Sequence, residues 1–191
     1  MNKANAIKDK NDIRRMSEWF KNYSKKYYTI FLIAINSGLR ISDVLGLNIS
    51  DVKDRDYVEI HEKKTGKYKR FPLNKMVQNA IKDYLIDREK EYSINEQEPL
   101  FVGKKHCRMC RSQFYRIIRR CAEELGIKGT ISCHSTRKSF GYAHYRQFNN
   151  IALLQTIFSH SSGNITLRYI DIEQEEIDKS YLDLDLGLQT V

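Results

Sequence analysis

The sequence predicts one mainly helical α+β domain with about eight helices and one small antiparallel sheet. Apolar residues recur at intervals of three and four along most of the chain, which is the spacing of amphipathic helices. One pair of segments reads as two strands joined by a short turn. The chain has 191 residues, 41% of them hydrophobic, and this is enough for a buried core without a disulfide or metal staple.

The N-terminal part of the chain predicts three helices. Asp12 is the expected N-cap of a helix over 13–23, where apolar residues recur every three to four positions. The helix expected over 27–36 is apolar on most sides, and it ends at Gly38 because glycine tolerates the left-handed backbone past a helix end. A short helix around 42–47 is expected to follow.

The only expected hairpin and a long helix come next. Residues 57–60 and 68–73 read as two strands, and Lys64-Thr-Gly-Lys67 between them is the expected hairpin turn. Asn74 is the expected cap of a helix over 76–85. This part of the chain therefore supplies the predicted hairpin.

The second half of the chain is predicted to be helical apart from a short strand at 100–102. Ser112 and Asn164 are the expected caps of two of its helices, because their side chains can accept hydrogen bonds from free amides. The expected helices cover residues 112–125, 134–148, 151–158, 164–169 and 173–186.

The composition favours a nucleic-acid partner. Lysine and arginine number 33 against 24 acidic residues, a net charge of +9, and the chain has twelve tyrosines and eight phenylalanines. Basic and aromatic residues together are typical of nucleic-acid binding, although a basic protein with scattered lysines has the same composition. No apolar run approaches the ~20 residues of a membrane helix, and the N-terminus has no signal-peptide core. We therefore expect a cytoplasmic protein.

The four cysteines predict free thiols in a reducing compartment. Cys107 and Cys110 form a C-x-x-C pair, but a structural zinc site usually needs a second pair, which the sequence lacks. The pair also lacks the strand-then-helix setting of a redox motif. We expect no metal site.

Four segments carry side chains suited to phosphate chemistry. His134 and Arg137, three residues apart, share one helix face and could hold a phosphate oxygen. Taken singly, each segment has an ordinary explanation, such as a solvated turn, a helix surface or a packed tyrosine. The segments are Gly38-Leu-Arg40, Lys64-Thr-Gly-Lys67, His134-Ser-Thr-Arg137, and His160 followed nine residues later by Tyr169.

In their order and spacing, these segments resemble the tyrosine recombinase (phage integrase) family over residues 10–175. Gly38-Leu-Arg40-Ile-Ser-Asp43-Val-Leu-Gly-Leu47 resembles the first-arginine motif, and Lys64-Thr-Gly-Lys67 resembles the hairpin-lysine motif. His134-x-x-Arg137 resembles the H-x-x-R box, and residues 154–169 resemble the closing histidine-to-tyrosine segment. The sequence departs from the family at Ser159, where Gly is frequent, and at Lys138, where a second His is common.

The resemblance implies an integrase-type catalytic domain that cuts and rejoins DNA at specific sites through a 3′-phosphotyrosyl intermediate. The outcome would be integration, excision, inversion or resolution, for a phage or another mobile element. Tyr169 would be the nucleophile, and Lys64 would protonate the leaving 5′-oxygen. Asp43 would orient the arginines or the histidine from behind. The implied catalytic residues are Arg40, Lys64, His134, Arg137, His160 and Tyr169.

The division of acid and base roles among His134, His160 and Lys64 stays open at this stage. No metal or cofactor is implied, since two arginines can stabilise the charge that a metal would otherwise stabilise.

The resemblance also implies partners. Double-stranded DNA is the first, although a solvated basic face also explains the arginines of the 112–125 helix. The protein would be a monomer when free and a homotetramer on DNA, where the 173–186 helix could be exchanged between protomers and a DNA-bending protein could assist. The implied DNA contacts are Lys67, Arg111, Arg116, Arg119, Arg120 and Lys138.

Most family members carry an N-terminal core-binding domain, which this sequence lacks. We expect one catalytic domain over residues 1–191, either a short form resembling the fimbrial phase-switching invertases or a fragment of a larger integrase. It would act on the nucleoid in the bacterial cytoplasm. Two alternatives are a type IB topoisomerase, which relaxes supercoils without sequence choice, and a DNA-binding regulator without strand cleavage.

Overall fold

The computed structural model describes residues 4–91, 94–103, 106–172 and 180–185. These residues form eight α-helices, one 3-10 helix and one two-stranded antiparallel sheet, which confirms the predicted fold class. The elements are α1 (Lys10–Tyr23), α2 (Lys25–Ser37), α3 (Ile41–Val44), η1 (Ile49–Asp51), β1 (Tyr57–His61), β2 (Tyr68–Pro72), α4 (Lys75–Glu91), α5 (Arg111–Glu124), α6 (Cys133–Phe148), α7 (Ile151–Phe158) and α8 (Gly163–Tyr169).

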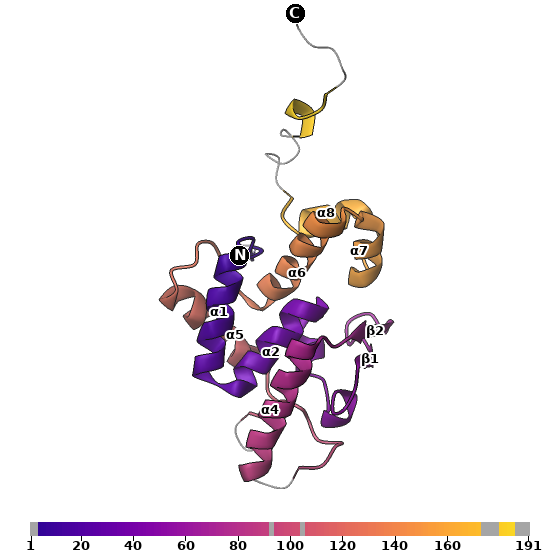
Figure 1. The fold of residues 1–191 in the computed structure, drawn as a ribbon. Coiled ribbons are helices and arrows are strands. Elements are labelled where there is room, and N and C mark those ends of the chain that lie inside the picture. The colour runs from indigo at the N-terminus through magenta and orange to yellow at the C-terminus, as the bar shows by residue number, and fades with distance from the viewer. Residues whose placement is uncertain (1–3, 92–93, 104–105, 173–179, 186–191) are drawn as a thin grey trace, which may run out of the picture.

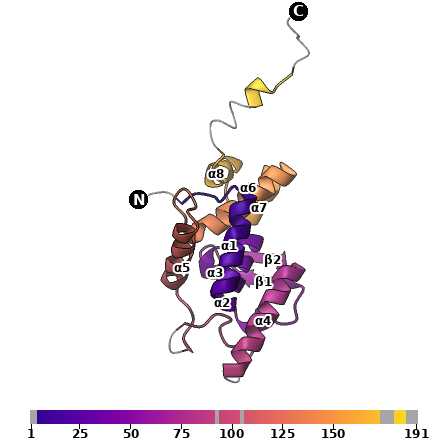
Figure 2. The same ribbon diagram turned by 60° about the vertical axis from the view of Figure 1, so that its left-hand side comes forward.

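Helix α2 lies at the centre of the molecule. It packs against α1, α4 and α6, and α5 packs against both α1 and α6. Helices α7 and α8 pack on each other beyond the end of α6, and the β1–β2 hairpin lies between α7 and α4 in both views (Figures 1 and 2). The C-terminal end of α2, the hairpin and the helices after α5 therefore meet on one side of the molecule.

The main core explains why α2 is central. Residues 30–34 of α2 are all buried, as the apolar character of this segment predicted. The Phe20 ring of α1 stacks on Phe31 of α2 at 4.8 Å and lies 6.0 Å from the Phe114 ring of α5. A second, smaller apolar cluster forms around Leu154, Phe158 and Ile170 beneath α6–α8, and this cluster supports the last two helices.

Gly38 ends α2, as predicted, and the structure adds a second reason for glycine. Its φ of 62° lies in the left-handed region, and a Cβ atom built there would lie 2.5 Å from Cδ1 of Phe140 on α6. The close approach of α6 to this turn is therefore possible only without a side chain at position 38.

Three of the predicted helix caps are placed two or three residues too late, because a residue upstream caps each of these helices. The Asp9 carboxylate accepts from the Asn11 amide, and the Ser162 hydroxyl accepts from the Ile165 amide. The predicted caps lie inside the first turn in each case. The observed caps are Asp9 in place of Asp12, Cys110 in place of Ser112, and Ser162 in place of Asn164.

The prediction of a strand at 100–102 is wrong. Isolated bridges join Asn48 to Pro99 and Val102 to Arg108, and the described residues hold no third strand. Nη1 of Arg108 donates to the carbonyls of residues 45–47, with N···O distances of 3.1, 2.6 and 2.9 Å. The Leu100 amide also donates to the Leu47 carbonyl, at 2.9 Å, so the segment is bonded to its neighbours through single bridges and not through a ladder.

The helix expected over 173–186 lies largely outside the described residues. Of that range the structure describes 180–185, whose side chains are exposed. In the described part of the chain, no helix is both long enough and apolar enough to cross a membrane.

Candidate active site

Four of the six predicted catalytic residues gather in one partly buried cluster of side chains, called the pocket below, at the end of α2, the hairpin, α6 and α8. The rings of His160 and Tyr169 lie 5.2 Å apart, and the Arg137 Cζ atom lies 5.9 Å from the Tyr169 ring. Arg40 enters from the turn after α2 and shares the buried carboxylate of Glu62 with Arg137. The pocket thus gathers two guanidinium groups, one imidazole and one phenol from segments far apart in the sequence.

Arg137 is held rigidly at the centre of the pocket. Its side chain is 3% exposed, with Nη1 donating to the Gly38 carbonyl at 2.5 Å and Nη2 donating to the Phe158 carbonyl at 2.9 Å. Its Cζ atom also lies 4.3 Å from the centre of the Phe158 ring. These two carbonyls, at the ends of α2 and α7, fix the plane of the guanidinium before any ligand binds.

Arg40 has more freedom than Arg137. It is the N-cap residue of α3, and its side chain is 19% exposed. One nitrogen, Nη1, donates to Glu62 Oε1 at 2.7 Å. The guanidinium is therefore anchored on one side and open to solvent on another, as a group that binds an incoming anion must be.

His160 is a neutral ring in this pocket. Burial and then the charge of Arg137 lower its pKa to about 4. Its Nδ1 lies 3.1 Å from the Thr166 hydroxyl, which itself donates to the Ser162 carbonyl. With the hydroxyl proton used in that way, Nδ1–H is the donor to Thr166 and Nε2 is left as an acceptor.

Tyr169 ends α8 with its ring packed edge-on against Phe158 and His160. Burial raises the pKa of its phenol, while the charges of Arg137 and Arg40 act against that rise. The phenol is therefore protonated at neutral pH. A base must accept its proton if the oxygen is to act as a nucleophile.

The backbone conformation of Ser159 explains why the family pattern often has glycine at this position. It is the C-cap residue of α7, with a φ of 53° in the left-handed region that glycine adopts freely. Serine can occupy this position at a cost of about 1 kcal/mol relative to glycine. The turn that delivers His160 is thus preserved despite the substitution.

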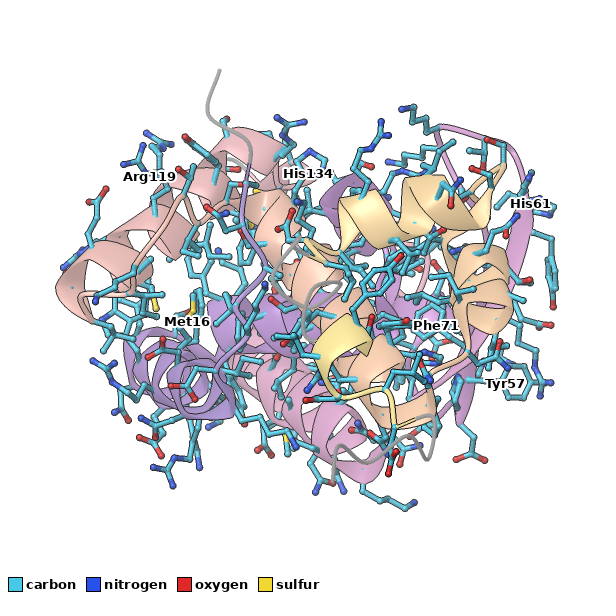
Figure 3. All side chains as sticks on the ribbon, turned by 90° about the horizontal axis from the view of Figure 1, so that it is seen from above. Met16, Tyr57, His61, Phe71, Arg119 and His134 are labelled. Atoms are coloured by element: carbon cyan, nitrogen blue, oxygen red, sulfur yellow. The ribbon has the colours of Figure 1, made fainter. Side chains whose placement is uncertain are left out.

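His134 lies in the first turn of α6, one turn before Arg137, and its side chain is exposed. Partial burial lowers its pKa, and the charge of Arg111 lowers it further. A groove of about 780 Å³ joins His134 to Arg111, Tyr115 and Arg119 of α5. Figure 3 shows Arg119 and His134 along the same side of the molecule.

Lys64 is the sixth predicted catalytic residue, and the structure does not bring it into the pocket. It lies in the turn between β1 and β2, where its side chain is exposed and makes no hydrogen bond or ion pair with any described residue. The two neighbouring residues are both anchored. The Lys63 amide donates to Asp43 Oδ1 at 3.0 Å, and the Thr65 hydroxyl donates to Glu62 Oε2 at 2.6 Å.

Asp43 is buried, as expected of a supporting residue, but it contacts the turn between β1 and β2. Its Oδ1 accepts from the Lys63 amide, while Oδ2 is buried without a hydrogen-bond partner. The expectation that Asp43 orients the arginines or the histidine is therefore not met in this structure. The carboxylate holds the turn that carries Lys64.

The sequence reasoning missed Glu62 and Lys69, which complete the pocket. The Glu62 side chain is fully buried, with Oε1 lying 2.7 Å from Arg40 and 3.3 Å from Lys69 Nζ. Lys69 also donates to the Ile157 carbonyl. A signal was present, because Lys69 and Phe71 alternate on the inward face of β2.

The pKa values of Glu62 and Lys69 are both lowered, by different combinations of burial and neighbouring charge. Burial alone would raise the pKa of Glu62, but the Thr65 hydroxyl and the charges of Lys69 and Arg40 lower it to about 2. Burial, followed by repulsion from Arg137, lowers the pKa of Lys69. The carboxylate is therefore ionised at every pH at which the protein would work.

The arginines predicted to contact DNA separate into two stripes on α5. Arg111 and Arg119 line the groove that reaches His134. Arg120 instead lies 5.6 Å from the Tyr23 ring of α1, and Arg116 lies close enough to Tyr27 of α2 to influence its pKa. Lys67 is exposed on the hairpin turn. Only the first stripe shares a groove with a predicted catalytic residue.

Lys138 is a correction to the predicted DNA contacts. Its side chain is 3% exposed, and Nζ lies 2.6 Å from Asp171 Oδ1 and 5.5 Å from the Tyr169 ring. A buried, paired ammonium cannot reach a phosphate on the surface. At this position, where the family often has histidine, the lysine instead ties the segment after Tyr169 to α6.

The four cysteines are free thiols, exposed at Cys107 and Cys110 and buried at Cys121 and Cys133. Among the residues that the structure describes, no three histidine, cysteine or acidic side chains gather as metal ligands would.

The sequence matches the Phage integrase family over residues 8–176. It is 34% identical over 185 residues to the probable integrase/recombinase YoeC of Bacillus subtilis, covering 95% of this chain and 97% of YoeC. It is 27% identical over 143 residues to the type 1 fimbriae regulatory protein FimE of Escherichia coli K12, covering 74% and 72%. The match to tyrosine recombinase XerC of Caldanaerobacter subterraneus is 26% identical, covering 81% of this chain but 44% of XerC.

Solved structures share the fold. The XerA recombinase superposes with a TM-score of 0.77 at 21% identity, covering all of this chain and 68% of XerA. The catalytic domain of bacteriophage HP1 integrase superposes with a TM-score of 0.64 at 17% identity, covering 99% and 100%. XerH in its post-cleavage complex with difH DNA gives 0.76 at 19% identity, covering 95% and 54%.

Proposed function

Since the chain belongs to the phage integrase family, it is a tyrosine-type recombinase, and we propose that it cuts and rejoins DNA at a specific site through Tyr169. The observation that carries this proposal is the position of Tyr169. Its ring lies beside His160 and within 5.9 Å of the Arg137 guanidinium of the same chain. A nucleophile and the cations that would hold its target phosphate are thus assembled in one pocket.

The reaction divides one strand transfer into two steps. The Tyr169 oxygen attacks a backbone phosphorus, a 3′-phosphotyrosyl bond forms, and the P–O5′ bond breaks to release a 5′-hydroxyl. A 5′-hydroxyl from another strand then attacks the phosphotyrosine and restores a phosphodiester. The covalent link conserves the energy of the broken bond.

The arginines stabilise the charge that develops on the phosphate. Arg137 is fixed by the carbonyls of Gly38 and Phe158, so it needs no reorganisation when DNA binds. Arg40 has an open side that can donate to a non-bridging oxygen. Loss of one such donor typically slows the chemical step by ~10²–10³.

Two proton transfers complete the step. Neutral His160, whose ring centre lies 5.2 Å from that of Tyr169, is the proposed base through Nε2. His134 is the proposed phosphate donor at the rim, because it opens onto the groove along α5. Lys64 is the proposed acid for the 5′-oxygen, which it would reach from its exposed position once DNA lies across the hairpin.

Duplex DNA is the proposed partner, lying along the side that carries His134 and the Arg111–Arg119 stripe. The DNA-bound state of several structural neighbours supports this partner. Four protomers are proposed to assemble on two sites, because exchanging both strands of two duplexes needs four cleavages. A DNA-bending protein and action on the nucleoid belong to the same proposal.

The test is covalent trapping on nicked duplexes that tile the DNA flanking the gene. A nick beside the cleavage point lets the short 5′-hydroxyl strand diffuse away, so the phosphotyrosyl adduct accumulates and survives SDS. We expect an adduct with the wild type and none with Tyr169→Phe at equal DNA binding. Salt-sensitive binding without an adduct on any tile would contradict the proposal and favour a regulator. Relaxation of a plasmid without the site would favour a topoisomerase.

A further inference from the structure

We propose that Glu62 is a positioning residue that connects the turn carrying Lys64 to Arg40. The contact fixes the position of the proton donor relative to the phosphate-binding arginine. The inference rests on the proposed function, since it concerns how that reaction receives its leaving-group proton. It starts from a carboxylate that has no part in the chemistry of the four clustered catalytic residues yet is completely buried among them.

The two oxygens of Glu62 face different parts of the site. Oε1 accepts from Arg40 at 2.7 Å, with Lys69 at 3.3 Å and Arg137 at 4.0 Å. Oε2 accepts from the Thr65 hydroxyl at 2.6 Å. The carboxylate is therefore a bridge, with the phosphate-binding cations on one side and the residue next to Lys64 on the other.

The backbone of the turn is tied to the same residue. The Gly66 amide donates to the Glu62 carbonyl at 2.8 Å, and the Glu62 amide donates to the Lys67 carbonyl at 2.9 Å. On the other side of Lys64, the Lys63 amide is held by Asp43, three residues after Arg40. The Lys64 side chain is thus exposed and unpartnered, while the backbone on both sides of it is anchored to the Arg40 region.

Burial makes this arrangement specific. A fully buried carboxylate is costly unless charges and hydrogen bonds compensate it, and Glu62 has one hydroxyl and two close cations. Glu62, Thr65 and Lys69 all belong to the hairpin, so a hairpin that moved away from Arg40 would keep the Thr65 and Lys69 contacts but would remove the Arg40 cation from the buried carboxylate. The position of the turn is therefore coupled to the position of the arginine.

The chemistry of the leaving group gives a direct test. When cleavage breaks the P–O5′ bond, the 5′-oxygen takes a proton from Lys64. A substrate with sulfur in place of that bridging oxygen releases a thiolate, which needs no proton. Lys64→Ala should therefore cleave the oxygen substrate ~10²–10⁴-fold more slowly than the wild type, yet cleave the sulfur substrate at nearly the wild-type rate.

Thr65→Val breaks the bridge and leaves Glu62, Arg40 and Lys64 in place. We expect it to slow cleavage of the oxygen substrate at least tenfold and to be rescued by sulfur to within about twofold of the wild type. Glu62→Gln should also raise the ratio of sulfur to oxygen cleavage rates. Its matched control is Glu59→Gln, which changes a carboxylate on β1 three residues before Glu62. Glu59 accepts from the Tyr68 hydroxyl at the surface, and its substitution should leave the ratio unchanged.

The ratio of the cleavage rates on the sulfur and oxygen substrates does not depend on the fraction of folded protein. A destabilised variant can therefore still be tested. An equal defect on both substrates, or no defect in Thr65→Val, would overturn the inference. The wild type tests the proposed function separately. No Tyr169 adduct on either substrate would overturn that function, whereas a wild-type adduct together with an unrescued Thr65→Val would overturn only the role of Glu62.

Discussion

The side chains around Tyr169 carry a positive excess when no DNA is bound. Arg40, Arg137 and Lys69 face one carboxylate, Glu62, so the excess is two charges. All three cations contribute to the low pKa of His160, and the two arginines limit the rise in the pKa of Tyr169. A phosphodiester, and still more the transition state derived from it, would neutralise this excess.

The low pKa of His160 predicts a pH-dependent loss of stability. The unfolded chain binds a proton on this ring near pH 6.5 and the folded chain near 4, so the unfolded state binds more protons between these values. The contribution of the neutral ring is complete above pH 6.5 and is lost as the pH falls towards 4. Between pH 7.5 and 5 we expect the wild type to lose about 2 kcal/mol more unfolding free energy than His160→Gln.

Urea unfolding at the two pH values measures this difference. His134, whose pKa is also lowered, is present in both proteins, so its contribution cancels in the comparison. Equal losses for the wild type and His160→Gln would contradict a depressed pKa at His160.

Helix α6 is the element that connects the pieces of the site. It presents Arg137 towards the carbonyls of Gly38 and Phe158, and its Ser139 hydroxyl accepts from the Ile7 amide of the N-terminal segment. One turn beyond Arg137, Gly141 lets Phe158 approach the helix backbone. The packing of α6 thus decides where α7 and α8 place His160 and Tyr169.

Gly141→Ala should therefore destabilise the protein even though alanine is the better helix former. The added Cβ would lie 2.6 Å from Phe158 and 2.7 Å from Ile170, both fully buried. We expect an overpacking cost of about 2 kcal/mol, partly offset by a gain of about 1 kcal/mol in helix propensity. Chemical denaturation measures the balance.

Gly163→Ala is the matched control, because a Cβ there makes only ordinary contacts at 3.7 Å or more. This variant should be neutral or slightly stabilising. If Gly141→Ala proved as stable as Gly163→Ala, the close packing of Phe158 on α6 would be contradicted.

Helix α5 offers a comparison between two arginines in similar ion pairs. Arg119 pairs with Glu123 and Arg120 pairs with Glu124, each at 2.7 Å and each on the surface. Only Arg119 lines the groove that reaches His134, while Arg120 lies near Tyr23. Arg119→Gln should weaken DNA binding and reduce the slope of log K against log salt by about one, as expected for one lost phosphate contact.

Arg120→Gln should leave both the affinity and the salt slope close to those of the wild type. Fluorescence anisotropy with a labelled duplex at several salt concentrations measures both quantities. Equal effects of the two substitutions would mean that the DNA does not follow the groove.

The sequence predicted the elements better than their contacts. Apolar spacing and the turn at Lys64–Lys67 were sufficient for the helices and the hairpin, because these signals are local. The inward face of β2 could have been found in the same way, since Lys69 alternates with Phe71. The strand expected at 100–102 did not form because the segment pairs only through isolated bridges, to Asn48 at one end and to Arg108 at the other, and these partners are not encoded by a local pattern.

At the scale of the whole molecule, the site depends on contacts between residues distant in sequence. The order and spacing of the motifs indicated which residues belong together, but not that Arg137 donates to Gly38, 99 residues away. Nor could they show that Lys138 is buried against Asp171 instead of facing DNA. Both contacts depend on how α6 packs against α2 and against the segment after α8. Local sequence patterns do not encode this packing.

The central claim is that one chain assembles the catalytic site within its own fold, because Tyr169 packs against His160 and Arg137 of the same chain. The most direct measurement mixes Tyr169→Phe with an Arg40→Ala variant of different mass and traps adducts on a nicked site. We predict no more adduct than Arg40→Ala forms alone. A strong adduct on the Arg40→Ala chain would mean that its tyrosine had entered the intact pocket of another protomer, and this would contradict the claim.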